Sequence, residues 1–325
     1  MSAPTISVVV NTLNEARNIG LLLQAVGPWA DEVVVVDMHS DDGTAQIARD
    51  MGARVFEHER IGFVEPAREF AVAQSSGDWI LLLDADEIPH PSLARRLREL
   101  AATNAPYDVV LIPRLEIMLG RPIIHGGWWP LKKARFFRRE AMDLTPIIHH
   151  GLQPRPDARI HRLPASADAA IWHFSHFDLA EFVSSANHYT SIESRQMAEA
   201  GWRPKRPHQL LWPMIVDIAV RYVKRRGYRD GVPGLALAVV RAMNRFLRAA
   251  KAWEQSDLQR RADRIATLKT RMVALYDAMN TDSNSVPPAA SRPRKRRPAT
   301  KRAAPKPAGS RGARATASSS PHETA

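Results

Sequence analysis

The chain has 325 residues, of which 45% are hydrophobic, and a formal net charge of +12 at neutral pH. That length supports one large domain with appendages or two modest domains. The absence of cysteine excludes disulfides, thiol nucleophiles and cysteine metal sites. The apolar runs at 210–220 and 232–240 are too short to span a bilayer, and no signal peptide is visible. We therefore expect a cytoplasmic protein without a transmembrane segment.

The first hundred residues alternate short apolar runs with helical patterns. Each β-branched or leucine-rich run ends in polar residues, and a stretch of helical periodicity follows it. This order predicts βαβ units and a mostly parallel, doubly wound α/β sheet. The expected strands are 6–10, 33–36, 54–56 and 79–83, and the expected helices are 19–26, 47–51, 66–74 and 92–101.

The alternation of strands and helices is lost after Tyr107. A Gly-, Pro- and Trp-rich stretch at 120–130 has no regular period, as expected where a second substrate binds. From Leu179 onward helical patterns dominate. The expected strands here are 109–112, 135–139 and 170–174, and the expected helices are 179–198, 210–225 and 234–276.

The last of these helices is amphipathic. We favour an arrangement in which its apolar stripe faces the core and its basic arc faces solvent. The alternative is a helix that lies on a membrane surface. The stripe is Leu235, Val239, Met243, Phe246, Ala250 and Trp253, and the arc is Arg241, Arg245, Arg248 and Lys251.

The final segment, 281–325, contains ten basic and two acidic residues, which is +8 of the net charge. It is rich in Pro, Ala and Ser and lacks aromatic residues, so we expect a disordered arm. A solubilising tail is favoured slightly over an anionic membrane contact, and nucleic acid is not an expected partner. The predicted division is a domain at 1–178 with halves 1–105 and 106–178, a helical region at 179–280, and this tail.

The segment LLLDADE contains the most informative acids. Asp84 and Asp86 follow a buried strand and point the same way, because alternate residues of an extended segment share a face. Ligands of parallel sheets bind beyond the carboxyl ends of the strands. Two carboxylates at that place suit Mg2+ or Mn2+ bridging phosphates, although acids at a helix N-terminus are the alternative interpretation.

Four segments together carry a resemblance to a known family. TLNEARNIG, VVVDMHSDDGT and VEPAREFAVAQSSGDWILLLDADE occur in that order over residues 6–100, and GGWWPLKKARFFRR follows at 126–139. They resemble family 2 glycosyltransferases of the GT-A fold, and the fourth is similar to the branch that builds lipopolysaccharide core and surface glycans. The resemblance implies metal-assisted, inverting transfer of a sugar from a nucleotide-sugar, with UDP favoured, to a glycan or lipid-linked acceptor.

The resemblance also implies roles for individual residues. Asp86, with Asp84, would hold the cation, which neutralises the leaving diphosphate, and Arg68 would add a positive charge there. Asp84 would also reach the ribose. The alternative role for Asp37 and Thr12 is to cap the loops and form turns, which Asp, Asn and Thr commonly do. The expected nucleotide-sugar ligands are Thr12, Asn14, Glu15, Asp37, His39, Arg68 and Asp84.

The base that inversion requires is not fixed by the pattern. The branch shows a His-Glu pair where this chain has His149 and His150, so the glutamate is missing. We predict His150, His149 or Asp143 as the base, and Glu140 and Glu116 are further candidates.

Two other functions are weighed against sugar transfer. A sugar-phosphate nucleotidyltransferase would need a Gly-rich loop after the first strand, and TLNEARN has none in its place. A degenerate transferase that acts as a binding protein is disfavoured by the intact acids. We therefore predict a transferase that is peripheral at the inner face of the cell membrane.

Overall fold

A computed structural model describes residues 3–60, 65–103, 106–144, 152–204 and 206–283. The chain divides into two compact units, Met1–Arg261 and Ala262–Ala325. Within the residues described, ten strands form the larger sheet, in the order β3-β2-β1-β4-β8-β6-β12-β5, with β7 and β11 paired to β6. Strands β9 and β10 form a separate pair.

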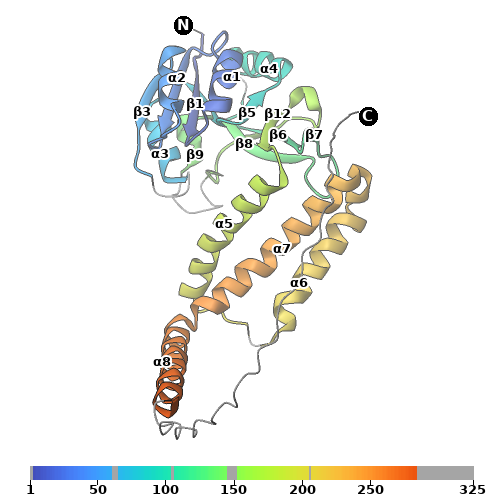
Figure 1. The fold of residues 1–325 in the computed structure, drawn as a ribbon. Helices are drawn as coiled ribbons and strands as arrows, with labels where there is room; N and C mark the ends of the chain where they lie inside the picture. Colours follow the sequence, from blue (N-terminus) through green and yellow to red (C-terminus); the bar gives the residue numbers. More distant parts are fainter. Residues whose placement is uncertain (1–2, 61–64, 104–105, 145–151, 205, 284–325) are drawn as a thin grey trace, which may run out of the picture. The chain divides into compact units, whose positions relative to one another are not determined.

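The amino-terminal half of this sheet is parallel. Strands β1 (Ile6–Thr12), β2 (Glu32–Asp37), β3 (Arg54–Glu57) and β4 (Trp79–Asp84) pair in parallel, with β1 between β2 and β4. Every residue of β1 is buried, as expected for a strand covered on both faces. Figure 1 shows the helices of this half around the sheet. They are α1 (Ala16–Val26), α2 (Thr44–Asp50), α3 (Glu65–Gln74) and α4 (Pro91–Ala102).

The other half of the sheet mixes parallel and antiparallel pairs. Strand β8 (Leu131–Arg138) runs antiparallel to both β4 and β6 (Val109–Met118), and the rings of Trp79 and Phe136 stack at 4.6 Å between centroids. Strand β12 (Ile171–His176) lies between β6 and the short β5 (Glu87–Pro89). The remaining strands are β7 (Arg121–Pro122), β9 (Met142–Asp143), β10 (Gln153–Pro154) and β11 (Ile160–Arg162). The predicted α/β fold with a mostly parallel sheet is confirmed.

Helices that pack against one another follow the sheet. Helix α5 (Leu179–Glu199) and helix α6 (His208–Ile218) both pack against α7 (Gly231–Gln255), as Figure 1 shows. A π-helical turn (Ala219–Lys224) extends α6, and short 3-10 turns occur at Arg139–Ala141, Ala167–Ala169 and Gly227–Asp230.

The single helix expected at 234–276 is wrong. The structure has α7 and then α8 (Leu258–Ser283). The break coincides with Ser256 and Asp257, residue types that compete with helical hydrogen bonds, and Ser256 Oγ donates to the Trp253 carbonyl at 2.7 Å.

The face of α7 that packs against its neighbours also differs from the expected stripe. Leu235 and Trp253 of that stripe are 43% and 51% exposed, whereas the small side chains of Ala238, Ala242 and Ala249 are buried. Small residues let the axes of α5 and α6 approach α7 closely, so this stripe of alanines forms the contact. The arginines expected to face bulk solvent line a cavity, described below.

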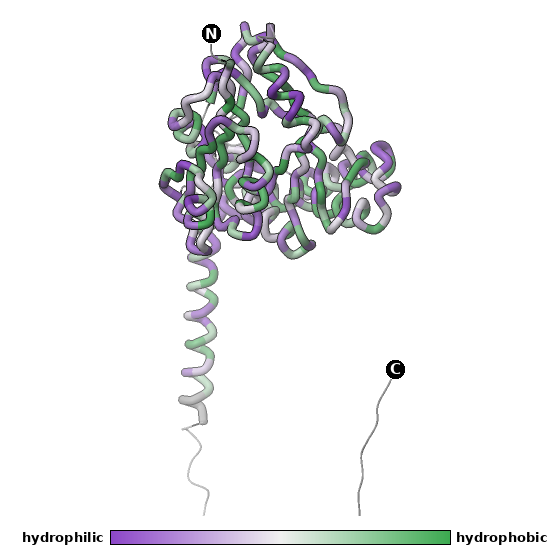
Figure 2. Tube along the Cα trace, turned by 90° about the horizontal axis from the view of Figure 1, so that it is seen from above, coloured by the Kyte–Doolittle hydropathy of each residue, from purple (hydrophilic) through white to green (hydrophobic). Residues whose placement is uncertain are grey.

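Among the described residues, none of the helices combines the length and apolar content needed to cross a membrane. In Figure 2 hydrophilic and hydrophobic colours alternate along α8. Its described apolar side chains, including Leu268 and Val273, are exposed.

Candidate active site

The carboxyl ends of β1, β2 and β4 bring the predicted polar residues to one edge of the sheet. Thr12 is in register with Asp37 of β2, and Asn11 is in register with Asp84 of β4. The side chain of Thr12 and that of Asn11 are buried there, and their polar atoms have no hydrogen-bond partner among the described residues. Unpaired buried polar atoms are costly, so they mark a place where a polar ligand would be favourable.

The loops after β1 and β2 hold each other in place. Ser40 donates from its backbone N–H to Asp37 Oδ2 at 2.8 Å and from its hydroxyl to Oδ1 at 2.5 Å. The same hydroxyl accepts from the Asn14 N–H at 2.8 Å, and Asn14 Oδ1 accepts from the Asp41 N–H at 3.0 Å. Asp37 and Asn14 therefore have the turn-capping role that was the alternative to nucleotide binding.

Two further loop residues differ in exposure. His39 has a φ of 56°, in the left-handed region, and its side chain is exposed. Glu15 is half-buried, and its Oε2 accepts from Asn18 Nδ2 at 2.6 Å. Burial raises the pKa of Glu15, and the negative charge of Asp86 raises it further. Glu15 therefore belongs to the electrostatic surroundings of Asp86.

Asp84 is held between two arginines. Its Oδ1 lies 2.9 Å from Arg68 Nη2, and its Oδ2 lies 2.6 Å from Arg135 Nη2. Burial alone would raise the pKa of Asp84, but the guanidinium groups of Arg135 and Arg68 hold it well below its usual value. Asp84 is therefore a charged acceptor whose two oxygens are both already bonded.

A buried glutamate continues the same ionic contacts. Glu87 is completely buried, and its Oε1 accepts from Arg135 Nη2 at 2.8 Å and from Arg114 Nη1 at 3.1 Å. Glu87 Oε2 accepts from the backbone N–H of Asp84 at 3.0 Å. These bonds fix the turn between Asp84 and the strand β5.

Asp86 belongs to that turn and contacts a histidine. Its Oδ2 is 3.2 Å from His173 Nε2, and His173 Nδ1 is 2.5 Å from Glu116 Oε2. Strand β12 makes this arrangement possible, because His173 is in register with both Glu87 and Glu116. Burial would lower the pKa of His173, but Asp86 and Glu116 outweigh it and raise the pKa to about 10.

These contacts join into one continuous series of alternating charges, which we call the charge chain. Arg114 completes it by donating from Nε to Glu116 Oε1 at 2.8 Å. The chain runs Arg68, Asp84, Arg135, Glu87, Arg114, Glu116, His173 and Asp86.

Sequence reasoning missed the central members of the charge chain, Glu87, Arg114 and Arg135. A usable signal was present, because Arg114 and Glu116 alternate on one face of an otherwise apolar strand. Opposite charges two residues apart in a buried strand indicate an internal ion pair.

The predicted bases are not brought to the charge chain by the described contacts. Asp143 lies on β9 and pairs with Arg155 at 3.3 Å. Glu140 lines a different cavity, together with Arg139 and Asp157. His149 and His150 lie outside the described residues. Glu116 is the one earlier candidate that is part of the charge chain.

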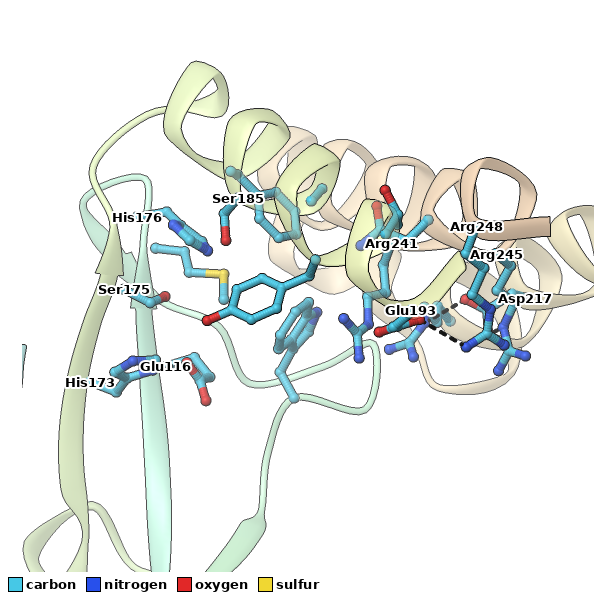
Figure 3. Close-up of a pocket in the computed structure, with 18 of the residues that line it drawn as sticks. Glu116, His173, Ser175, His176, Ser185, Glu193, Asp217, Arg241, Arg245 and Arg248 are labelled. Atoms are coloured by element: carbon cyan, nitrogen blue, oxygen red, sulfur yellow. Dashed lines mark hydrogen bonds and ion pairs between the residues drawn. The ribbon is translucent and has the colours of Figure 1, made fainter. Parts of the chain in front are cut away.

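A cavity of about 310 Å3 opens beside Glu116 and His173. Figure 3 shows these two residues, with Ser175 and His176, at one end. At the other end are Glu193, Asp217 and three arginines of α7. The cavity therefore extends from the charge chain to the contact of α5, α6 and α7.

A divalent cation fits part of this arrangement. No group of three or more acidic or histidine side chains suited to a metal occurs in the described residues. Asp86 and His173 nevertheless form an oxygen and nitrogen pair, and Glu116 accepts from the other ring nitrogen of His173. A carboxylate in that position is the usual support of a histidine that binds a metal, and Mg2+ is commonly held by one or two protein ligands plus phosphate oxygens.

Residues 7–155 match the family described as glycosyl transferase family 2. The chain carries a glycosyl transferase family 2 domain. The predicted resemblance and the transferase activity are thereby confirmed, and they agree with the placement of polar residues at the carboxyl edge of a parallel sheet.

Two relatives extend the similarity beyond this domain. A protein of Rickettsia bellii, described as an uncharacterized glycosyltransferase, is 28% identical over 277 residues, which are 82% of this chain and 92% of the relative. The lipopolysaccharide core biosynthesis glycosyltransferase LpsC of Rhizobium meliloti is 26% identical over 262 residues, 79% of this chain and 94% of the relative. Both alignments are longer than the family 2 domain.

Among solved structures, a glucosyl-3-phosphoglycerate synthase from Mycobacterium tuberculosis overlaps 62% of this chain and 82% of its own, with a TM-score of 0.41 and 21% identity. So partial an overlap of backbones says nothing about which ligands this glycosyltransferase binds.

Proposed function

We propose that the protein transfers a sugar, with inversion, from a nucleoside diphosphate sugar to a hydroxyl of a glycan or lipid-linked acceptor. We further propose a UDP-sugar as the donor and Mg2+ or Mn2+ as the cation. The observation that carries this proposal is the pair of Asp86 and His173 beside Asp84, at the sheet edge where β1 and β2 also end.

The nucleotide would lie over the ends of β1 and β2. The unpaired polar atoms of Asn11 and Thr12 offer hydrogen bonds to it. Asp37 keeps acceptor capacity beyond its bonds to Ser40, because each carboxylate oxygen accepts more than one hydrogen bond. Asn14, Glu15 and His39 belong to the same two loops and remain predicted contacts.

Asp84 is proposed to contact the ribose and not the cation. Its charge is already balanced by Arg68 and Arg135, so binding a metal would take a charged partner away from each of these two guanidinium groups. Arg68 is proposed to act near the diphosphate through its fixed positive charge. This differs from the first expectation, in which Asp84 shared the metal.

Asp86 and His173 are proposed to hold the cation. When bound, the cation would neutralise charge on the departing diphosphate. The chain itself orients these ligands, because Arg114 holds Glu116 and Glu116 holds the histidine ring. His173 must lose the proton on Nε2 to bind a metal, so cation affinity should rise with pH.

The acceptor would enter the cavity beside His173. Its volume of about 310 Å3 lies at the lower end of the range for small-ligand sites, which is enough for a sugar residue of a larger acceptor. His149, His150 and Asp143 remain the predicted bases.

Peripheral membrane attachment is proposed through α6. Its side chains Leu211, Trp212 and Ile215 are more than half exposed. Lys224, Arg225 and Arg226 follow the same helix and are exposed. An apolar helix face with tryptophan and adjacent basic residues is typical of helices that lie on anionic membranes.

A donor screen tests the proposal. The full chain would be incubated with UDP- and GDP-sugars and Mn2+, and the released nucleoside diphosphate would be measured with and without a chelator. We expect slow, chelator-sensitive hydrolysis of one UDP-sugar. Release from none of the donors by folded protein, or release that ignores the chelator, would contradict the proposed donor and metal.

A further inference from the structure

Four arginines gather at the end of the cavity that is remote from His173. Arg241, Arg245 and Arg248 project from α7 at spacings of four and three residues, which places them on one side of that helix. Arg221 comes from the π-helical turn after α6. Within the described part of the chain, Asp217 and Glu193 are the acids that line this end, so the lining carries an excess of positive charge.

The two acids are already paired with three of the arginines. Asp217 Oδ2 lies 2.8 Å from Arg221 Nε, and its Oδ1 lies 3.2 Å from Arg245 Nε. Glu193 Oε2 lies 3.2 Å from Arg248 Nη1. Figure 3 draws ion pairs at this end of the cavity as dashed lines. They fix the positions of three guanidinium groups around the end of the cavity.

Arg241 is the exception in this cluster. Among the residues that the structure describes, it has no hydrogen bond or ion pair, although Asp217 and Glu193 are nearby. Removal of water by surrounding protein atoms lowers the pKa of Arg241, and the positive charge of Arg221 lowers it further. The side chain of Arg241 is exposed and lines the cavity, so its guanidinium is accessible to an anion that enters there.

Neutral polar groups in the same cavity are also unpaired. Ser175 Oγ and Asn244 Oδ1 are inaccessible to solvent and have no partner in the described part of the chain. They belong to different elements, β12 and α7, and both residues line the cavity. Such groups suit the hydroxyls of a sugar that lies between the charge chain and the arginines.

We propose that the arginine end of the cavity binds a phosphate group carried by the acceptor, with Arg241 as its main ligand and Arg221 and Arg245 beside it. Guanidinium groups match phosphate oxygens with paired hydrogen bonds. This inference rests on the proposed function, because it assumes that the cavity holds the acceptor. It adds that the acceptor is phosphorylated, whether on a soluble glycan or on a lipid.

Calorimetric titration of inorganic phosphate into the full chain, with the donor site saturated by UDP and Mg2+, tests the inference. We expect binding that weakens at least tenfold in Arg241→Gln and less in Arg241→Lys, which keeps the charge but loses the planar fork. Arg229→Gln is the matched control, since Arg229 is exposed and does not line the cavity.

Two further measurements distinguish a failure of the proposed phosphate site from a misfolded variant and from a failure of the proposed function. The midpoint temperature of thermal unfolding should be unchanged or slightly higher in Arg241→Gln. No hydrogen bond or ion pair is lost, and the repulsion between Arg241 and the neighbouring arginines is relieved. UDP binding with Mg2+ should survive in Arg241→Gln, so its absence from every variant would count against the proposed function and not against this site.

Binding of the protein to lipid vesicles distinguishes the two possible sources of the phosphate. If Arg241→Gln also weakens binding to phosphatidylglycerol vesicles but not to phosphatidylcholine vesicles, the phosphate belongs to a lipid. If only inorganic phosphate binding falls, a soluble phosphorylated glycan is supported. Phosphate binding that is absent, or that is the same in Arg241→Gln and the wild type, would overturn the inference.

Discussion

The guanidinium of Arg135 lies 2.6 Å from the carboxylate of Asp84, where β8 runs alongside β4. Arg135 is only 3% exposed, and the same nitrogen bonds Glu87. One arginine thus compensates two acids beneath the proposed donor site. It sets the orientation of Asp84 and leaves Asp86 as the acid directed toward the histidine.

Replacement of Arg135 by methionine should strongly destabilise the fold. Asp84 would keep Arg68, but Glu87 would lose one of its two buried partners, and breaking a buried ion pair costs about 3–5 kcal/mol. Urea unfolding measures this loss. Arg49→Met is the control, because Arg49 and Glu57 pair on the surface, where an ion pair contributes less than about 1 kcal/mol. Equal losses in the two variants would contradict the role given to the charge chain.

Replacement of His173 by alanine should weaken Mn2+ binding more than it weakens folding. A protein ligand to the proposed cation would be lost, while Glu116 would keep its bonds to Arg114. We expect the Kd for Mn2+, measured in the presence of UDP, to rise by about 10- to 100-fold. His208→Ala at the start of α6 serves as the control. An unchanged Kd would remove His173 from the cation site.

The stability of the fold should depend on the ionisation of Asp108. Its hydrogen bonds with Arg159 are the largest cause that lowers its pKa to about 2. A carboxyl with a depressed pKa stabilises the fold above its unfolded pKa, near 3.8, and that contribution is lost as pH falls toward 2.

Asp108→Asn should therefore be only slightly less stable than the wild type at pH 7, because Arg159 is exposed and solvent screens the ion pair. Thermal unfolding at pH 7, 5, 4 and 3 should show the difference narrowing below pH 4. A difference that stays constant over this range would assign the effect to packing and not to charge.

The apolar face of α6 should decide membrane attachment. Replacing both Trp212 and Ile215 by glutamine in the full chain should reduce flotation with anionic vesicles several-fold, since two large apolar contacts are lost. Leu21→Gln is the control, because Leu21 of α1 is equally exposed to solvent. If both variants float like the wild type, attachment through α6 is wrong.

The strand ends were predictable from sequence because their signals are local. Apolar runs such as Trp79 to Leu83 are followed at once by acids, and the parallel pairing then brings Thr12, Asp37 and Asp84 to one edge. The helix break at Ser256 was missed, because the apolar period continues past it. The alanine face of α7 was missed because the neighbouring helices, and not the period of large apolar residues, decide which face is packed.

The partner of Asp86 could not be predicted from the sequence for a different reason. His173 is 87 residues further along the chain, and it meets Asp86 because β12 inserts between β5 and β6. No local pattern specifies that insertion. The period of the α7 arginines indicated a solvated face, and they do stay partly exposed, but the neighbouring helices make that face one wall of a cavity.

Calorimetric titration of UDP in the presence and absence of Mn2+ tests the central claim most directly. The wild type should bind UDP at least tenfold more tightly with Mn2+, and Asp86→Ala should lose that gain while remaining folded. Asp50→Ala, which removes an exposed acid bonded to Gln46, should behave as the wild type does. Binding of UDP that is equally Mn2+-dependent in Asp86→Ala, or absent from folded wild-type protein, would contradict the assignment of this edge of the sheet as a metal-assisted donor site.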